Sequence, residues 1–232
     1  MFLLNCKKDN RAFYINATFQ TSNIATVNPP RLYTRNGEIT DPLIVRKYID
    51  RYSNHFSINV FEFNNGTQLL DSALYFKIHF RENNTARIER FPPYPPGVPS
   101  SLENHEASFY NTSPDQLLIS EIDSLVMTLP VSHCNDLIKN SISYYPYYNC
   151  IPIGSNLSCK WKNTFPVKIS ENQLSLPMII LLTSSGDPLT TGGCAYIMHK
   201  DILNTFNLTV LNTLLPTDTI ALQTKEVILQ RL

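Results

Sequence analysis

Regular alternation of apolar and polar residues constrains the fold of this chain more than any other feature of its sequence. In residues 74–81 every second residue is Leu, Phe or Ile, and polar or tyrosine side chains lie between them. A period of two places the apolar side chains on one face of a β-strand. The turn residues at 82–84 and a second strand-like run at 85–91 then predict a β-hairpin.

Other segments share these signals, and one has helical spacing instead. The further predicted strands are residues 12–20, 31–34, 58–63, 116–120, 125–129, 167–169, 194–198 and 219–229. Residues 178–182 form a continuous apolar run, which is typical of a strand buried on both faces. Asp41 and Pro42 precede apolar positions at helical spacing, which predicts one short helix near residues 41–53.

These elements predict an all-β, mostly antiparallel fold, either a lipocalin-like barrel or a β-sandwich. The 23 Asn and 16 Pro against only 7 Gly agree with strands separated by Asn and Pro turns. We expect residues 11–232 to form a single β-rich domain. Within it, a proline-rich segment and the polar residues that follow predict a long loop at 91–114, because proline lacks the N–H that a sheet interior needs.

The charge balance and the absence of known motifs exclude several classes of function. The chain has 19 Lys and Arg against 19 Asp and Glu, whereas nucleic-acid-binding proteins usually carry a basic face. No window of about 18 apolar residues predicts a membrane-spanning helix. No motif of a serine hydrolase, zinc protease, calcium loop or nucleotide site occurs. We therefore expect no nucleic-acid partner, cofactor or metal site, and we favour a protein that is not an enzyme over a hydrolase without recognised motifs.

The first ten residues, MFLLNCKKDN, join a short apolar run to a cysteine and then to charged residues. This pattern resembles the lipobox of Bacteroidetes-type bacterial lipoproteins. The resemblance implies that Cys6 is the lipid attachment site and that residues 1–10 are a signal-peptide remnant and lipid-anchor tether. It also implies a location in the bacterial cell envelope, as an outer-membrane lipoprotein that is periplasmic or surface-exposed. Several acyl chains would hold a neutral protein on a membrane without a basic patch.

Four cysteines remain after Cys6, namely Cys134, Cys150, Cys159 and Cys194. An even number permits two disulfides in any of three pairings, which would persist outside a reducing cytosol. The alternative is four buried free thiols, which pack as small apolar residues.

An aromatic group is the best ligand-binding candidate that the sequence offers. It comprises Tyr94, Tyr144, Tyr145, Tyr147, Tyr148 and Trp161. Aromatic faces pack against sugar rings or small apolar ligands, and tyrosine hydroxyls donate hydrogen bonds. The alternative is that these side chains cover the core beneath a loop.

Three functional hypotheses follow. The first is a lipid-anchored envelope protein that acts as a non-enzymatic binding or structural module, with a protein partner that the sequence does not identify. The second is a lipocalin-like carrier of a small apolar or glycan ligand, and the third is a secreted hydrolase without recognised motifs. An apolar cavity would favour the carrier and a filled barrel the interaction module. A cleft with a carboxylate beside His105 or His133 would favour the hydrolase.

Overall fold

The structure of the chain is a computed structural model. It describes residues 14–56, 60–64, 66–69, 75–90, 102–122, 125–170, 173–187, 192–198 and 202–232.

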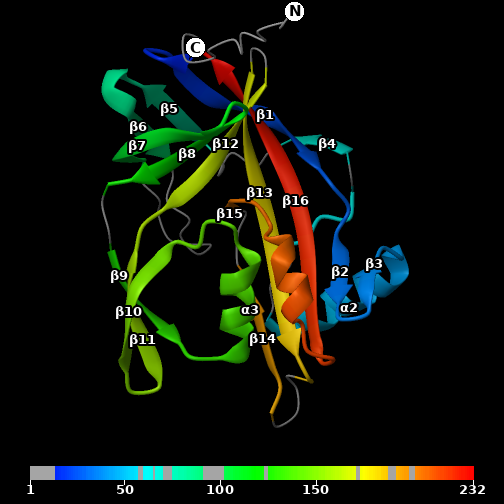
Figure 1. Cartoon of the computed structure of the whole chain (residues 1–232). Helices are drawn as coiled ribbons and strands as arrows, with labels where there is room; N and C mark the ends of the chain where they lie inside the picture. The colour runs from blue at the N-terminus through cyan, green and yellow to red at the C-terminus, as the bar shows by residue number, and fades with distance from the viewer. Residues whose placement is uncertain are drawn as a thin grey trace, which may run out of the picture.

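Eight antiparallel strands close into a barrel, which forms the upper half of Figure 1. They are β1 (Thr18–Val27), β5 (Phe76–Phe80), β6 (Thr85–Arg90), β7 (Glu103–Ser113), β8 (Gln116–Glu121), β12 (Thr164–Ser170), β13 (Gln173–Ser185) and β16 (Asp218–Arg231). The barrel closes because β16 pairs with β1 on one side and with β13 on the other. The order around the barrel is the order along the chain, so the strands form an up-and-down meander. The predicted lipocalin-like barrel is therefore confirmed, in preference to a sandwich.

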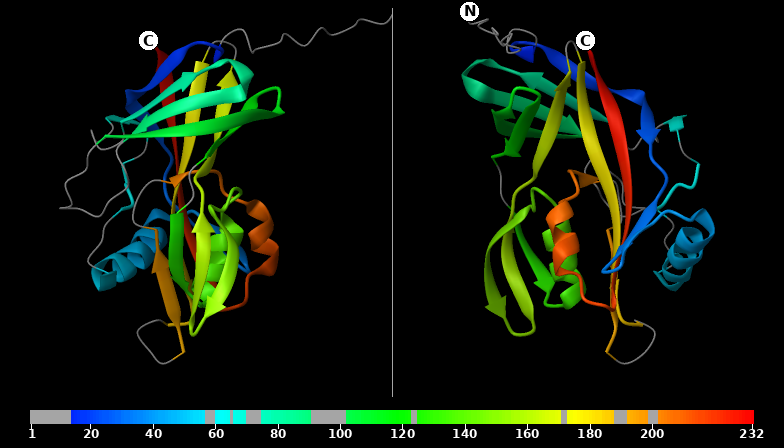
Figure 2. Two further views of the ribbon diagram at one scale, coloured as in Figure 1. Left: turned by 90° about the vertical axis from the view of Figure 1, so that its left-hand side faces the viewer. Right: turned by 45° about the vertical axis from the view of Figure 1, so that its right-hand side comes forward.

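Three excursions leave this meander. The first contains β2 (Arg31–Thr34), β3 (Gly37–Ile39), α2 (Pro42–Phe56) and β4 (Gly66–Leu69). The second contains β9 (Leu125–Pro130), α3 (His133–Ser141), β10 (Tyr147–Ile153) and β11 (Asn156–Trp161). The third contains β14 (Cys194–Ile197), β15 (Ile202–Leu203) and the 3-10 helix η3 (Leu208–Thr213), and a short 3-10 turn η2 (Glu82–Asn84) joins β5 to β6. The helices α2, α3 and η3 and strands β9 to β11 lie at the end of the molecule opposite to where β1 begins and β16 ends (Figures 1 and 2).

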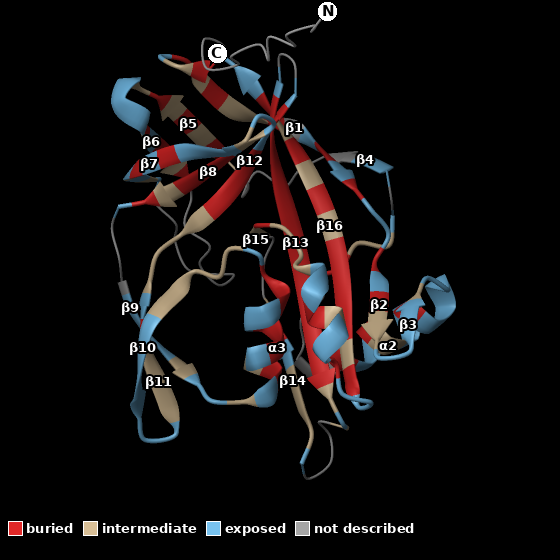
Figure 3. Cartoon of the chain, in the orientation of Figure 1, coloured by how far each residue is buried: buried red, intermediate tan, exposed pale blue. Residues whose placement is uncertain are grey.

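Apolar side chains fill the interior of the barrel. Its largest members, among them Phe19, Phe80 and Phe165, are less than 2 % exposed. They come from alternate positions of neighbouring strands, as the period of two requires. The strands that carry them are red in Figure 3. The barrel is thus a packed core.

Strand β13 belongs to the barrel at one end and to an open sheet at the other. In its second half Ile179 and Leu181 pack with α3 and η3, whereas Ile180 and Leu182 pack against the face covered by α2. The prediction that residues 178–182 form a strand buried on both faces is therefore confirmed.

One predicted helix is confirmed, and a second was missed. Helix α2 covers the predicted segment, and the Asp41 carboxylate accepts a hydrogen bond from the backbone N–H of Leu43 at 2.9 Å. Helix α3 was not predicted. Its N-cap is Ser132, whose hydroxyl accepts from the N–H of Asn135 at 3.2 Å.

The predicted loop at 91–114 is wrong over most of its described part, residues 102–114. Residues 103–113 form β7, which pairs with β6 and β8, and residues 91–101 lie outside the described part of the chain. The segment is polar because most of its side chains face solvent, with only Ala107 and Phe109 fully buried.

Two predicted strands also have the wrong limits. The first begins at Thr18 instead of residue 12, since Tyr14 to Ala17 form a turn. The described part of the strand predicted at 58–63, residues 60–63, is not in a strand.

Candidate interaction surface

Strands β9, β10 and β11 form a separate three-stranded sheet, the small sheet, in the order β10-β11-β9. It projects beside α3 and carries many exposed residues (Figure 3). Lys160 is the single charged residue in its three strands. Because most protein surfaces are richer in charge, this composition is typical of a surface that contacts a partner.

A disulfide between Cys150 and Cys159 holds β10 against β11. Between the strands, Gly154 and Ser155 form the turn, and Gly154 has a φ of 60°, a conformation that glycine adopts without strain. The two Cα atoms of the bridged cysteines are 4.0 Å apart. The hairpin is therefore fixed by both its turn and a covalent link.

The two faces of the small sheet differ because side chains alternate along each strand. On the inner face, Cys159 is fully buried, and the strand register places Met127 opposite it. The outer face carries Val126, Ile151 and Ile153, which are 70 %, 61 % and 57 % exposed. The same register adds Thr128, Pro130, Tyr148, Asn156, Ser158 and Lys160 to this outer face.

The predicted aromatic group divides between these faces. Tyr145 and Tyr147 contact each other, with ring centroids 5.2 Å apart, and Trp161 lies opposite Tyr147 in the register. Burial, followed by the neighbouring tyrosines, raises the pKa of both Tyr145 and Tyr147. Their hydroxyls are therefore neutral hydrogen-bonding groups at neutral pH, half-buried between the small sheet and the body of the molecule.

The remaining aromatic candidates do not join this cluster. Tyr148 lies on the outer face, opposite Lys160. Tyr144 exchanges hydrogen bonds between its backbone and the side chain of Asn204, at 3.1 and 2.8 Å. Tyr94 and the predicted lipid attachment site, Cys6, lie outside the described residues.

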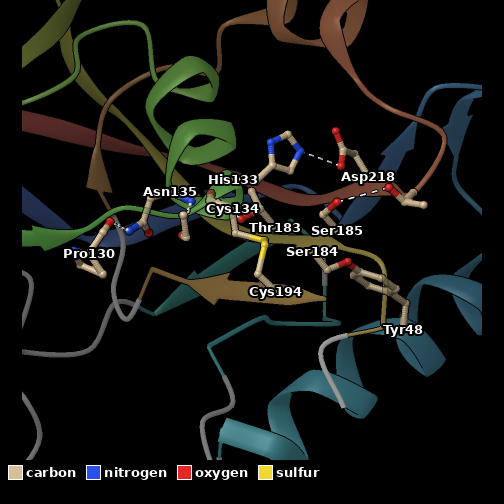
Figure 4. Close-up of a disulfide and its surroundings, with 12 residues drawn as sticks. Tyr48, Pro130, His133, Cys134, Asn135, Thr183, Ser184, Ser185, Cys194 and Asp218 are labelled. Atoms are coloured by element: carbon tan, nitrogen blue, oxygen red, sulfur yellow. Dashed lines mark hydrogen bonds and ion pairs between the residues drawn. A yellow bond between two sulfur atoms is a disulfide. The ribbon is translucent and has the colours of Figure 1, made fainter. Parts of the chain in front are cut away.

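The second disulfide joins Cys134 of α3 to Cys194 of β14 (Figure 4). The four cysteines therefore pair as 134–194 and 150–159. Next to it, the hydroxyl of Thr183 donates to the carbonyl of Cys134 at 3.1 Å. These contacts fasten α3 to the edge of the open sheet.

Two histidines have carboxylate partners. His133 Nε2 lies 2.9 Å from Oδ1 of the buried Asp218 (Figure 4). The other oxygen of Asp218, Oδ2, accepts from the N–H of Leu215. His105 Nε2 lies 3.2 Å from Oε2 of Glu103. In the part of the chain that the structure describes, no hydroxyl or thiol hydrogen-bonds to either of these imidazoles. Among the described residues, neither pair therefore has the nucleophile that a hydrolytic triad needs.

A polar hollow of about 510 Å³ lies on the outer wall of the barrel. In it, Glu226 accepts hydrogen bonds from the hydroxyl of Ser175 at 2.6 Å and from Lys168 Nζ at 3.1 Å. The hollow has no aromatic residue in its lining, so a sugar ring or apolar ligand would find no flat surface to pack against.

A buried ion pair closes the barrel at the end nearest the small sheet. Arg90 Nη2 lies 3.0 Å from Oε1 of Glu121, and the amide of Asn163 donates to the same carboxylate at 3.3 Å. Both charged side chains point inward and are buried. Because a buried charge is tolerated only when paired, this contact has a structural role at the barrel end.

Sequence reasoning missed the exposed apolar residues of the outer face, although one signal was present. Gly154-Ser155 is a hairpin dipeptide, and Cys150 and Cys159 are equally distant from it on either side. Two cysteines placed in this way face each other across a hairpin. This symmetry predicts both the β10–β11 hairpin and its disulfide.

No helix in the described segments is long and apolar enough to cross a bilayer. Among the same residues, His, Cys, Asp and Glu side chains form no group of three or more that could hold a metal ion. No protein-family model, curated protein or solved structure matches this chain.

Proposed function

We propose that this protein is a lipid-anchored component of the bacterial cell envelope, in which the barrel is a scaffold and the outer face of the small sheet binds a protein partner without catalysis. The observation that carries the binding role is the outer face itself. Val126, Ile151 and Ile153 are more than half exposed on a sheet that a disulfide holds in shape. A preformed apolar surface loses little conformational entropy when a partner covers it.

The packed barrel supports a binding module over a carrier. A carrier needs an internal space for its ligand, whereas the side chains inside this barrel are packed against one another. The exposed apolar residues lie on a different part of the molecule, at the end where the excursions gather. This separation favours a scaffold with a surface site.

Site-specific photo-crosslinking in cells tests the binding role. Tyr148 on the outer face is replaced by p-benzoylphenylalanine, and the matched control carries the same replacement at Tyr110, which is 54 % exposed on the barrel wall. We expect a defined adduct with a protein from position 148 only, and its loss when Ile151→Lys is added. The same adducts from both positions, or none from position 148, would contradict the proposal.

The anchor is tested by expressing the protein from its genomic start in a Bacteroidetes host. We expect the protein in the membrane fraction, with an intact mass that corresponds to a chain beginning at Cys6 and carrying acyl groups. The Cys6→Ala variant should lack the acyl mass and leave the membrane fraction. An unmodified wild-type chain in the soluble fraction would rule out the anchor and leave the binding role to the crosslinking experiment.

A further inference from the structure

We propose that the free edge of the small sheet pairs with the same edge of a second copy, so that two β9 strands join antiparallel into a continuous six-stranded sheet. This goes beyond the proposed function, because it uses the edge of the small sheet and leaves the outer face available.

The free edge belongs to β9. On one side β9 pairs with β11 from Leu125 to Pro130 without a register shift, and no strand among the described residues pairs with its other side. Val126 and Thr128, whose side chains lie on the outer face, are both exposed, and no described strand covers this edge. An open edge strand presents unpaired N–H and C=O groups, which are a template for another strand.

One hydrogen bond shows which backbone groups point outward. The N–H of Val131 donates to the carbonyl of Ser155 at 3.3 Å, in continuation of the β9–β11 register. Hydrogen-bonded and non-hydrogen-bonded pairs alternate along an antiparallel ladder. The odd-numbered residues of β9 therefore direct their N–H and C=O groups toward β11, and the even-numbered residues Val126, Thr128 and Pro130 direct theirs away from it.

Two of these three residues are free to pair. Pro130 has no N–H, and its carbonyl accepts a hydrogen bond from the side-chain amide of Asn135. Val126 and Thr128 each keep an outward N–H and C=O. A two-fold axis at Met127 places Val126 of one copy opposite Thr128 of the other, and both such pairs then exchange two N–H···O bonds. Val and Thr are also favourable cross-strand neighbours, because both are β-branched.

The lack of charge on β9 points to a second copy of the chain as the strand that pairs with this edge. Proteins normally protect an open edge with a charged residue, a proline or a bulge. Between Leu125 and Leu129, β9 has none of these, and its sequence LVMTL carries no charge. The nearest charge on the sheet is Lys160, which lies opposite Val126 on β11, so the two-fold arrangement brings no like charges together. An uncharged strand is complementary to its own copy.

Other edges of the two sheets carry protection that β9 lacks between Leu125 and Leu129. Strand β3 is three residues long, and its Glu38 forms an ion pair with Arg31 at 2.7 Å. Strand β10 contains Pro152 and a register shift between Tyr148 and Ile151. Strand β14 has four residues. The contrast indicates that β9 is the edge at which pairing is allowed.

The test is the oligomeric state of the full chain, measured by light scattering over a concentration series. We expect a dimer for the wild type. Thr128→Pro should halve the measured mass, because it removes an outward N–H that takes no part in the β9–β11 ladder. The matched control Thr128→Ala keeps the backbone N–H and should remain a dimer. A monomeric wild type, a dimeric Thr128→Pro or a monomeric Thr128→Ala would overturn the proposal.

Two further measurements make the test independent of folding defects. Circular dichroism should show a folded Thr128→Pro, and Val126→Lys, which places a charge on the edge without a backbone change, should also be monomeric. In a mixture of Val126→Cys and Thr128→Cys proteins, mild oxidation should link one copy of each, and neither protein alone should form this link. A link of each protein with itself would show a different register and overturn the proposed one.

The outcome is separable from that of the proposed function. Ile151→Lys alters the outer face and should remain a dimer while losing the partner adduct. Thr128→Pro should lose the dimer whatever its effect on the adduct, because Thr128 lies both on the outer face and at the edge. Loss of the adduct in Ile151→Lys therefore tests the partner, and loss of the dimer in Thr128→Pro tests the edge.

Discussion

At the scale of single residues, Glu226 couples the stability of the barrel wall to pH. Burial raises the pKa of Glu226, but hydrogen bonds from Ser175 and Lys168 and the charge of Lys168 outweigh it, so that the pKa lies below its ordinary value of 4.5. A lowered pKa in the folded protein means that the ionised carboxylate stabilises the fold. This stabilisation is present above about pH 4.5 and is lost as the pH falls through the folded-state pKa.

The variant Glu226→Gln tests this coupling, because glutamine can still accept from Ser175 but carries no charge. Since the side chains of Glu226 and Lys168 are both more than a third exposed, we expect the variant to lose only about 0.5 kcal/mol of unfolding free energy at neutral pH. The difference from wild type should shrink toward zero at an acid pH well below 4.5, where the carboxyl group is protonated in both the folded and the unfolded state. Urea denaturation at both pH values measures it, and an equal difference at both would contradict the assignment.

Gln223 shows why one strand prediction failed at the level of single side chains. Its fully buried amide accepts from the N–H of Glu62 at 2.9 Å and donates to the carbonyls of Glu62 and Asn28. The segment around Glu62 has the period of a strand, but its backbone hydrogen-bonds to the side chain of Gln223 and not to a neighbouring strand. A long-range partner of this kind, 161 residues away, leaves no mark on the local sequence.

At the scale of elements, the sequence predicted those whose pattern reflects burial. The alternating hairpin and the apolar run of β13 were both read correctly, since their side chains face a core. Strand β7 was read as a loop because both neighbours supply its backbone partners while most of its side chains face solvent. Helix α3 was missed because only one side of a nine-residue helix is buried. Both elements are formed by contacts with neighbouring segments in space, and the local composition does not record these contacts.

The disulfide of the β10–β11 hairpin should determine the rigidity of the small sheet. A short loop closed by a disulfide typically gains about 2–4 kcal/mol, and the outer face has little core of its own to replace it. In the double variant Cys150→Ser, Cys159→Ser, we expect faster hydrogen exchange in β10 and β11 and unchanged exchange in the barrel strands. Loss of the Tyr148 adduct should accompany it.

The other disulfide provides the comparison. The double variant Cys134→Ser, Cys194→Ser removes the link between α3 and β14. In this variant, hydrogen exchange should become faster in those two elements. If hydrogen exchange in the Cys150→Ser, Cys159→Ser variant became faster throughout the barrel, the small sheet would not be an independent element.

At the scale of the whole molecule, the barrel separates the two proposed functions in space. Strand β1 begins beside the C-terminal residue, where the N–H of Leu232 donates to the carbonyl of Thr18 at 2.9 Å. The small sheet lies toward the other end of the molecule (Figure 2). A lipid on Cys6 would therefore hold the barrel by the end where β1 begins, since residues 7–14 reach at most about 28 Å. The outer face and the β9 edge would then point away from that membrane.

The tight packing inside the barrel allows an experiment that distinguishes a scaffold from a carrier. The ring of Phe80 contacts Tyr14, Phe19 and Phe109 inside the barrel, with centroids 5.1 to 5.9 Å apart. Phe80→Ala should lower the free energy of unfolding by about 3–5 kcal/mol, because it leaves a cavity that the barrel wall cannot fill. The exposed Tyr110→Ala on the same barrel should change it by about 0.5 kcal/mol or less.

Binding of a small apolar fluorescent probe completes this experiment. The wild-type barrel should not bind the probe inside, since the described side chains of its interior pack against one another, whereas the cavity of Phe80→Ala should take up a ligand of benzene size. The outer-face variant Ile151→Lys separates surface binding from internal binding, because it removes an apolar side chain from the surface alone. Saturable probe binding to the wild type that persists in Ile151→Lys and is weakened by Phe80→Ala would identify the barrel as a carrier, and the small sheet would then no longer be needed to explain the function.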